Sequence, residues 1–114
     1  MYLGMEELKL YQKLTDFALY IFPIVDKFPK FEKFALCTQI KNCVIDLIRL
    51  CIRANKSRSK RPILYDLDVK FEELKFLLRF AHARKYLSHN SFRHSAERLI
   101  EIGKVLGGWI KSVG

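Results

Sequence analysis

The chain has 114 residues, half of them hydrophobic, so it can bury one core and is not a disordered polar segment. Its longest uncharged run, residues 17–25, is far shorter than the roughly 20 apolar residues that cross a bilayer, and the first residues lack a signal-peptide pattern. We therefore expect one folded domain over residues 1–114, soluble and cytoplasmic, whose net charge of +9 favours anionic partners.

The first predicted helix spans residues 6–28. Its polar side carries Tyr20 and Pro23, and the proline ring would clash with the carbonyl of Leu19 and bend the helix on its outer face. Pro29 then ends the helix. Apolar residues three and four positions apart predict one buried stripe, made of Tyr11, Leu14, Ala18, Ile21, Val25 and Phe28.

A second helix is predicted over residues 32–55, with a buried stripe that contains all three cysteines. Cys37, Cys43 and Cys51 lie six and eight residues apart without a CxxC pair. This odd set within an apolar pattern indicates reduced core thiols rather than disulfides or metal ligands. Basic residues occupy the polar row of the helix and the short basic loop after it: Arg49, Arg53, Arg58, Lys60 and Arg61.

The third predicted helix, residues 62–86, has two apolar faces. One face runs from Leu64 to Ala81 at heptad-like spacing and is expected in the core. The other face lies roughly opposite, because two residues along an α-helix turn about 200 degrees. Two opposed apolar faces favour an oligomer interface, although a bent four-helix bundle could bury both rows. The second face consists of Phe76, Phe80, Ala83 and Leu87.

The last helix is expected to follow a turn at residues 87–90 and to contain three glycines. Gly103, Gly107 and Gly108 would each cost about 1 kcal/mol relative to alanine in a helix interior, so the bare surface they leave indicates close packing. Gly103 and Gly107 share one helical face. The alternative places Gly108 at the helix end, but the apolar pattern continues through Trp109.

Four helices of about 20 residues with brief connections predict an all-α, antiparallel up-down four-helix bundle. Asn90 or Ser91 could cap the last helix. The second apolar row and the glycine-rich helix together predict a homo-oligomer. Its expected interface consists of Phe76, Phe80, Leu87, Gly103, Gly107 and Trp109.

Positive charge is concentrated in the second half of the chain, and residues 75–96 contain no acidic side chain. One row of the third helix combines cations, a titratable ring and an aromatic ring: Lys75, Arg79, His82 and Tyr86. Such a row can follow a phosphate backbone and offer stacking, whereas the alternative is a solvated face that keeps the protein soluble. Arg84, Lys85 and Arg93 extend the predicted nucleic-acid or partner-binding surface by charge alone.

Motifs for catalysis are missing from the sequence. There is no glycine-rich phosphate loop, nucleophile elbow or HExxH motif, and the members of the acidic pair Glu72 and Glu73 diverge on a helix surface. His82, His89 and His94 lie near one turn, where a zinc site is the less favoured interpretation. We therefore expect no enzymatic activity, no metal and no cofactor.

Three segments carry a resemblance to a known family: the Phe28-Pro29-Lys30 turn leading into EKFAL, ELKFLLRF at residues 73–80, and EIGKVLGGWIKS at residues 101–112. With them the chain resembles the accessory variability determinant proteins of diversity-generating retroelements over nearly its whole length. The resemblance implies a ring of five four-helix protomers. Its basic surface would bind the retroelement's reverse transcriptase and RNA or DNA, and would support mutagenic copying without catalysing it.

In that family Lys75 and Arg79 correspond to basic positions of the third-helix motif that contact the partner and nucleic acid, whereas Arg84, Lys85 and Arg93 match no motif. The chain is also similar to the four-helix proteins encoded in intervening sequences of ribosomal RNA genes, which would imply a structural ring without a polymerase partner. A third possibility is a ligand-binding bundle, for which an apolar pocket inside one bundle would be the evidence.

Overall fold

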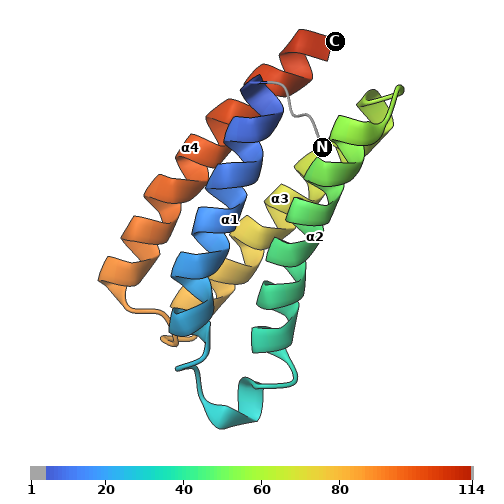
Figure 1. The fold of residues 1–114 in the computed structure, drawn as a ribbon. Coiled ribbons are helices and arrows are strands. Elements are labelled where there is room, and N and C mark those ends of the chain that lie inside the picture. The colour runs from blue at the N-terminus through green and yellow to red at the C-terminus, as the bar shows by residue number, and fades with distance from the viewer. Residues whose placement is uncertain (1–4, 114) are drawn as a thin grey trace.

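The computed structural model describes residues 5–113 and shows four long helices and one short 3-10 helix (Figure 1). No strand occurs in this range. The prediction of an all-α four-helix bundle is therefore confirmed. The elements are α1 (Met5–Val25), the 3-10 helix η1 (Lys30–Glu32), α2 (Leu36–Lys56), α3 (Arg61–Ala83) and α4 (His89–Val113).

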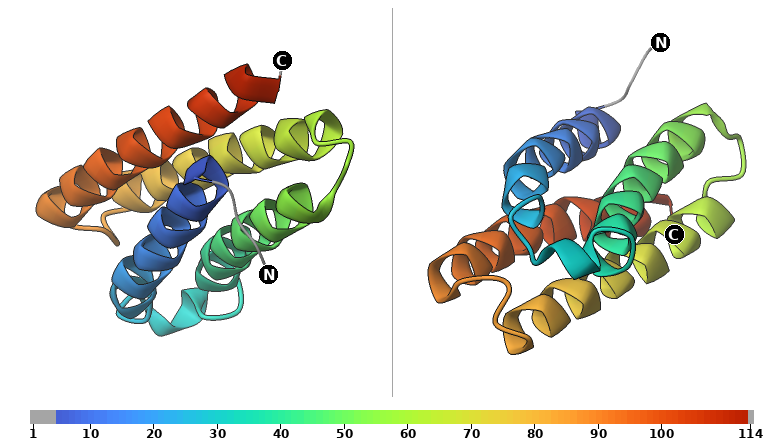
Figure 2. Two further views of the ribbon diagram at one scale, coloured as in Figure 1. Left: turned by 45° about the horizontal axis from the view of Figure 1, so that its top comes forward. Right: turned by 90° about the horizontal axis from the view of Figure 1, so that it is seen from below.

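The helices form two antiparallel hairpins, α1 with α2 and α3 with α4, which pack against each other around one core (Figure 2). α2 contacts α1 and α3, and α4 also contacts α1 and α3. η1 and the turn between α3 and α4 lie at one end of the bundle, whereas the loop between α2 and α3 lies at the other (Figure 1). The basic residues around the α3–α4 turn are thus separated from the basic loop after α2.

The buried stripe of α1 has the predicted spacing but does not contain every residue that the prediction places in it. Phe17 is buried, whereas Ala18, which the pattern places in the stripe, is only partly buried. Pro23 lies inside the helix and is exposed, as its place on the polar side predicts. Tyr20 is expected on that side as well but is half-buried, because the guanidinium carbon of Arg98 on α4 lies 4.2 Å from its ring centre.

The second apolar row of α3 divides between surface and core. Phe76 and Phe80 are 55% and 43% exposed, and their rings stack with centres 6.0 Å apart. Leu87 is only 2% exposed, because α3 ends at Ala83 and the chain then turns back over the core. Phe76 and Phe80 can therefore contact a second chain, while Leu87 is buried within its own bundle and leaves the expected oligomer interface.

The glycine-rich part of α4 also differs from expectation. A Cβ atom at Gly103 would lie 3.3 Å from the Phe71 ring, so this glycine admits an α3 side chain of the same bundle. Gly107 and Gly108 are exposed, and a Cβ atom there would meet nothing within 4 Å. Trp109 is only 2% exposed and belongs to the core. Of the three α4 residues that the sequence places in an oligomer interface, Gly107 is exposed, Gly103 packs against Phe71 of its own bundle, and Trp109 is buried.

The three cysteines are buried and form no disulfide within the described residues. The Cys37 thiol donates to the Val25 carbonyl at 3.5 Å, and the Cys43 thiol donates to the Lys70 carbonyl at 3.4 Å. Burial raises the pKa of both thiols, and that of Cys43 to about 11. The prediction that these cysteines are core residues is confirmed.

All three thiols should react slowly with a thiol reagent at pH 8 in the native protein and rapidly after denaturation. The reactive species is the thiolate; burial hides all three sulfur atoms, and for Cys37 and Cys43 it also disfavours that form. Labelling followed by intact-mass analysis measures this difference. Rapid native labelling of Cys43 would contradict its place in the core.

Candidate functional site

Hydrogen bonds at the end of α3 fix the turn in which part of the basic cluster lies. The Tyr86 N–H donates to the Ala81 carbonyl at 3.0 Å, and the Lys85 N–H donates to the His82 carbonyl at 2.9 Å. This pair of bonds is the Schellman motif of helix ends. Lys85 has a φ of 65°, the left-handed conformation that glycine usually occupies at this position. The motif ends α3 three residues before the predicted boundary.

The start of α4 is capped by Ser88. Its hydroxyl accepts a hydrogen bond from the Ser91 N–H at 3.1 Å, and its carbonyl accepts one from the Phe92 N–H at 2.8 Å. The helix begins at His89, so the cap lies before Asn90 and Ser91, the two residues expected to provide it. The cap and the Schellman motif together fix the backbone that carries the basic side chains of this turn.

Replacing Lys85 by glycine should raise the free energy of unfolding by about 1 kcal/mol, because the left-handed conformation costs a residue with a Cβ atom roughly that amount. Urea unfolding followed by circular dichroism measures the change. Ala83→Gly is the matched control: Ala83 is helical and exposed, so introducing a glycine there should cost about 1 kcal/mol. Destabilisation by Lys85→Gly would contradict this account of the turn.

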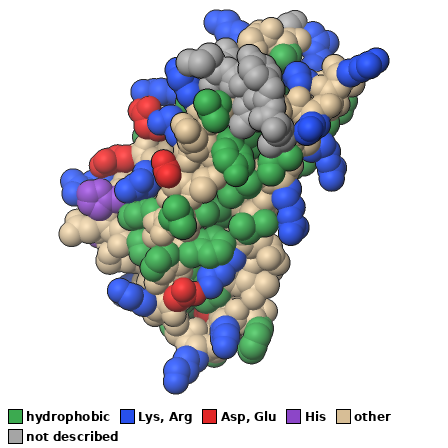
Figure 3. Space-filling model, in the orientation of Figure 1, with side chains coloured by type: hydrophobic (Ala, Val, Ile, Leu, Met, Phe, Trp, Pro, Cys, Tyr) green, Lys and Arg blue, Asp and Glu red, His purple; other side chains and the backbone are tan. Residues whose placement is uncertain are grey.

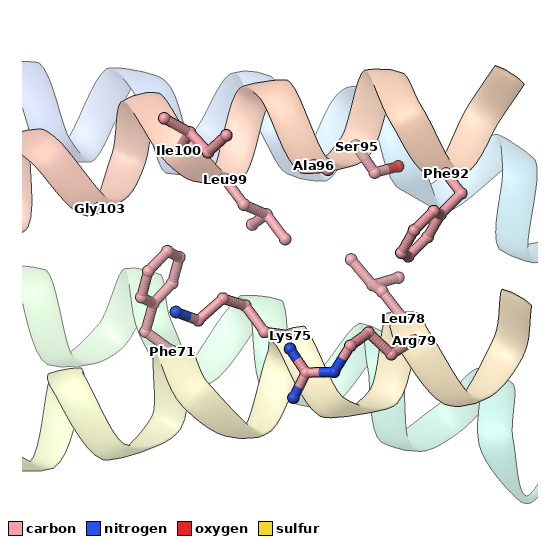
Figure 4. Close-up of a pocket in the computed structure, with 10 residues that line it drawn as sticks. All are labelled: Phe71, Lys75, Leu78, Arg79, Phe92, Ser95, Ala96, Leu99, Ile100 and Gly103. Atoms are coloured by element: carbon pink, nitrogen blue, oxygen red, sulfur yellow. The ribbon is translucent and has the colours of Figure 1, made fainter. Parts of the chain in front are cut away.

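Lys75 and Arg79 line a cavity of about 260 Å³ between α3 and α4 (Figure 4). The Lys75 ammonium pairs with Glu72 at 2.6 Å and lies 4.9 Å from the centre of the Phe71 ring. Arg79 is exposed and forms no ion pair with any described residue. The two predicted cations therefore share one groove, but only Arg79 offers an uncompensated charge.

The other two residues of the predicted α3 row, His82 and Tyr86, are only partly exposed, and Tyr86 lies outside the helix. The His82 ring stacks on Phe92 of α4, with ring centres 4.1 Å apart and planes within 5°. Tyr86 lies beyond the end of α3, and its hydroxyl donates to the Glu32 carboxylate at 2.9 Å. His82 and Tyr86 thus hold elements together, so within this row Lys75 and Arg79 are the residues that face the groove.

Arg84, Lys85 and Arg93 are exposed around the α3–α4 turn. Arg84 donates to the Tyr86 hydroxyl at 3.1 Å and lies over its ring, so this guanidinium is held against the aromatic ring. Lys85 and Arg93 form no ion pair within the part of the chain that the structure describes. With Arg79 they give this end of the α3–α4 hairpin a set of available positive charges.

The remaining predicted basic residues lie elsewhere. Arg49 and Arg53 of α2 line a wide hollow between α2 and α3, together with the exposed ring of Tyr65. Arg58 is exposed in the loop after α2, and Arg61 begins α3. The predicted residues are therefore distributed between the α3–α4 hairpin, the hollow between α2 and α3, and the loop after α2.

The Lys60 side chain has a structural role at the end of α2. Its ammonium donates to the carbonyls of Ala54, Asn55 and Ser57 at 2.8, 3.3 and 2.9 Å. These are carbonyls at the C-terminal end of α2, where a cation satisfies free acceptors and complements the helix dipole. Lys60 therefore contributes to the helix end rather than to an open basic loop.

The tip around η1 lies outside the set of site residues that the sequence predicts. Phe31 and Phe34 are 73% and 87% exposed there, next to Lys30 and Lys33. Figure 3 shows Lys and Arg side chains around the edge of the α1–α2 face and hydrophobic side chains in its middle. The signal is present in the sequence as FPKFEKF, but these apolar residues are equally compatible with a helix boundary and a core.

Comparison with known proteins agrees with the fold. The sequence model of the bAvd-like family matches residues 8–113, a range that includes most of α1 and all of α2, α3 and α4. The chain belongs to the bAvd-like family. This is the accessory variability determinant family that the three segments indicated. A search of curated proteins finds no match to the chain.

Membership of the bAvd-like family indicates an accessory role, in a family that is typically non-catalytic. Among the residues described, no cluster of three or more His, Cys, Asp or Glu side chains could hold a metal ion. Within the same range, none of the helices has the length and apolar character needed to cross a membrane.

Proposed function

We propose that this bAvd-like protein is a non-catalytic accessory factor that binds a retroelement reverse transcriptase and nucleic acid and thereby supports mutagenic retrohoming. The observation that carries the proposal is the acid-free segment 75–96, which folds into the end of the α3–α4 hairpin. Arg79, Lys85 and Arg93 are exposed there without ion pairs to described residues. Membership of the bAvd-like family is the reason for proposing a retroelement reverse transcriptase as the partner.

The physical basis is release of counterions from RNA or cDNA by exposed cations, which gives affinity that falls steeply with salt and carries little sequence information. The cations come from the end of α3, the turn and the start of α4, which all lie at one end of the bundle. Such an arrangement suits a flexible single strand or a template–cDNA hybrid held near a polymerase.

The direct test is co-expression with a reverse transcriptase of a diversity-generating retroelement, followed by purification of the complex and RNA-binding titrations at several salt concentrations. Co-purification and a steep salt dependence would support the proposal. A stable oligomer that captures neither polymerase nor RNA would instead select the alternative, a structural ring like the proteins of ribosomal RNA intervening sequences.

The same proposal includes assembly into a ring of five protomers. The surface that supports it is the exposed pair Phe76 and Phe80, whose stacked rings form an apolar patch on α3. Closed rings of identical chains bury one such patch per protomer against a different surface of the next.

Replacing Phe76 and Phe80 together by serine should dissociate the oligomer without loss of helical content, because both side chains are exposed in the single protomer. Native mass spectrometry measures assembly and circular dichroism measures fold. Leu19→Ser is the matched control, since Leu19 is also an exposed apolar residue but lies on α1. A monomeric parent protein, or a double variant that still assembles, would exclude this patch as the interface.

A further inference from the structure

The groove between α3 and α4 encloses a cavity with an apolar interior. Phe71, Leu78 and Leu99 are nearly fully buried and form its floor, while Ile100 is exposed at its edge (Figure 4). At one end of the groove the Phe71 ring packs against Gly103, where a Cβ atom would lie 3.3 Å from the ring, so this end is closed by the aromatic side chain. Its volume of about 260 Å³ suits a short chain or a single ring rather than a large cofactor.

The interior requires no polar partner from a ligand. The Ser95 hydroxyl, which is buried in the wall, already donates to the Ser91 carbonyl at 2.7 Å. No buried side-chain nitrogen or oxygen atom among the described residues lacks a hydrogen-bond partner. A ligand gains most in this groove by burying an apolar body, since a polar group placed there would lose its hydration without compensation.

Charge at the mouth of the groove adds a second requirement. The Lys75 ammonium is compensated by Glu72 at 2.6 Å, whereas the Arg79 guanidinium has no ion pair with a described residue. The mouth therefore carries one uncompensated positive charge beside an apolar cavity. A guanidinium presents two parallel N–H groups that match a carboxylate.

We propose that the α3–α4 groove binds a small amphipathic monocarboxylate, with its aliphatic or aromatic body between Leu78 and Leu99 and its carboxylate on Arg79. This inference rests on the geometry of the groove and is independent of the proposed polymerase and RNA binding. A nucleic-acid backbone could contact Arg79, but its phosphates and sugars would leave the apolar interior empty, so the groove has a ligand preference of its own.

The test uses octanoate, below its micelle-forming concentration, added to the assembled protein, with binding followed by calorimetry and by chemical shifts of the groove methyl groups. Acetate has the same charge without the body, and octylammonium has the same body with the opposite charge. Octanoate should bind at least about tenfold more tightly than either, because each lacks one of the two contacts. Equal binding of octylammonium would overturn the role of Arg79.

Two variants locate the site. Arg79→Gln should weaken octanoate binding by about tenfold, as expected when one charge-assisted hydrogen bond is removed. Ala96→Leu, which fills the groove from α4, should weaken octanoate binding while Arg79 remains. Lys111→Gln removes an exposed cation of α4 that lies outside the groove and outside the candidate set, and it should leave octanoate binding unchanged. Unchanged affinity in both groove variants, with native circular dichroism, would overturn the proposal.

Discussion

Replacing Trp109 by alanine should lower the free energy of unfolding by about 3 to 5 kcal/mol, a large part of the stability of a domain of this size. The indole is 2% exposed and is among the largest fully enclosed side chains of the core. Its removal loses transfer free energy and leaves a cavity that four packed helices cannot close without strain. Urea unfolding followed by circular dichroism measures the loss.

A substitution at Gly107 provides the control for the Trp109→Ala variant. Gly107 lies two residues earlier on the same helix, and a Cβ atom there would meet nothing within 4 Å. Gly107→Ala should therefore raise the free energy of unfolding by up to about 1 kcal/mol, through helix propensity alone. If Trp109→Ala instead dissociated an oligomer while the protomer kept its full stability, Trp109 would be an interface residue and its assignment to the core would fail.

The sequence predicts the helices well because each has a buried stripe with a period near 3.6 residues. The ends are harder to predict. α3 ends at Ala83 through a turn in which Lys85 adopts a left-handed conformation, and a lysine gives no signal for such a turn. This early end moves Tyr86 out of the basic row and brings Leu87 into the core.

The sequence predicts that the candidate site is positively charged, but it does not predict which side chains contact one another there. The acid-free segment is visible in the sequence, but which of its cations are available depends on neighbours from other elements. Arg84 is held by Tyr86, which is itself tied to Glu32, and in the basic loop Lys60 is bound by the end of α2. The groove is hidden for the same reason, since its lining comes from α3 and α4, whose residues are separated in the sequence.

The largest functional effect is expected from the double change Lys75→Ala and Arg79→Ala. Both side chains line the α3–α4 groove at the surface, so helical content and assembly should be retained, and removal of the Lys75–Glu72 pair should cost less than about 1 kcal/mol. RNA binding should weaken, and the slope of log affinity against log salt should become shallower by about one for each phosphate that is no longer neutralised. Support of retrohoming should be abolished.

A control of equal charge separates a local contact from the overall positive field. Lys9→Ala with Lys104→Ala also removes two of the positive charges that give the net charge of +9, from exposed positions on α1 and α4 outside the candidate set. In a ring, one polyanion spanning several protomers would multiply each local contact, so the groove variant should lose far more affinity than the control. Equal losses in the two variants would show that only net charge matters, and wild-type binding by the groove variant would move the contact to Lys85 and Arg93 at the turn.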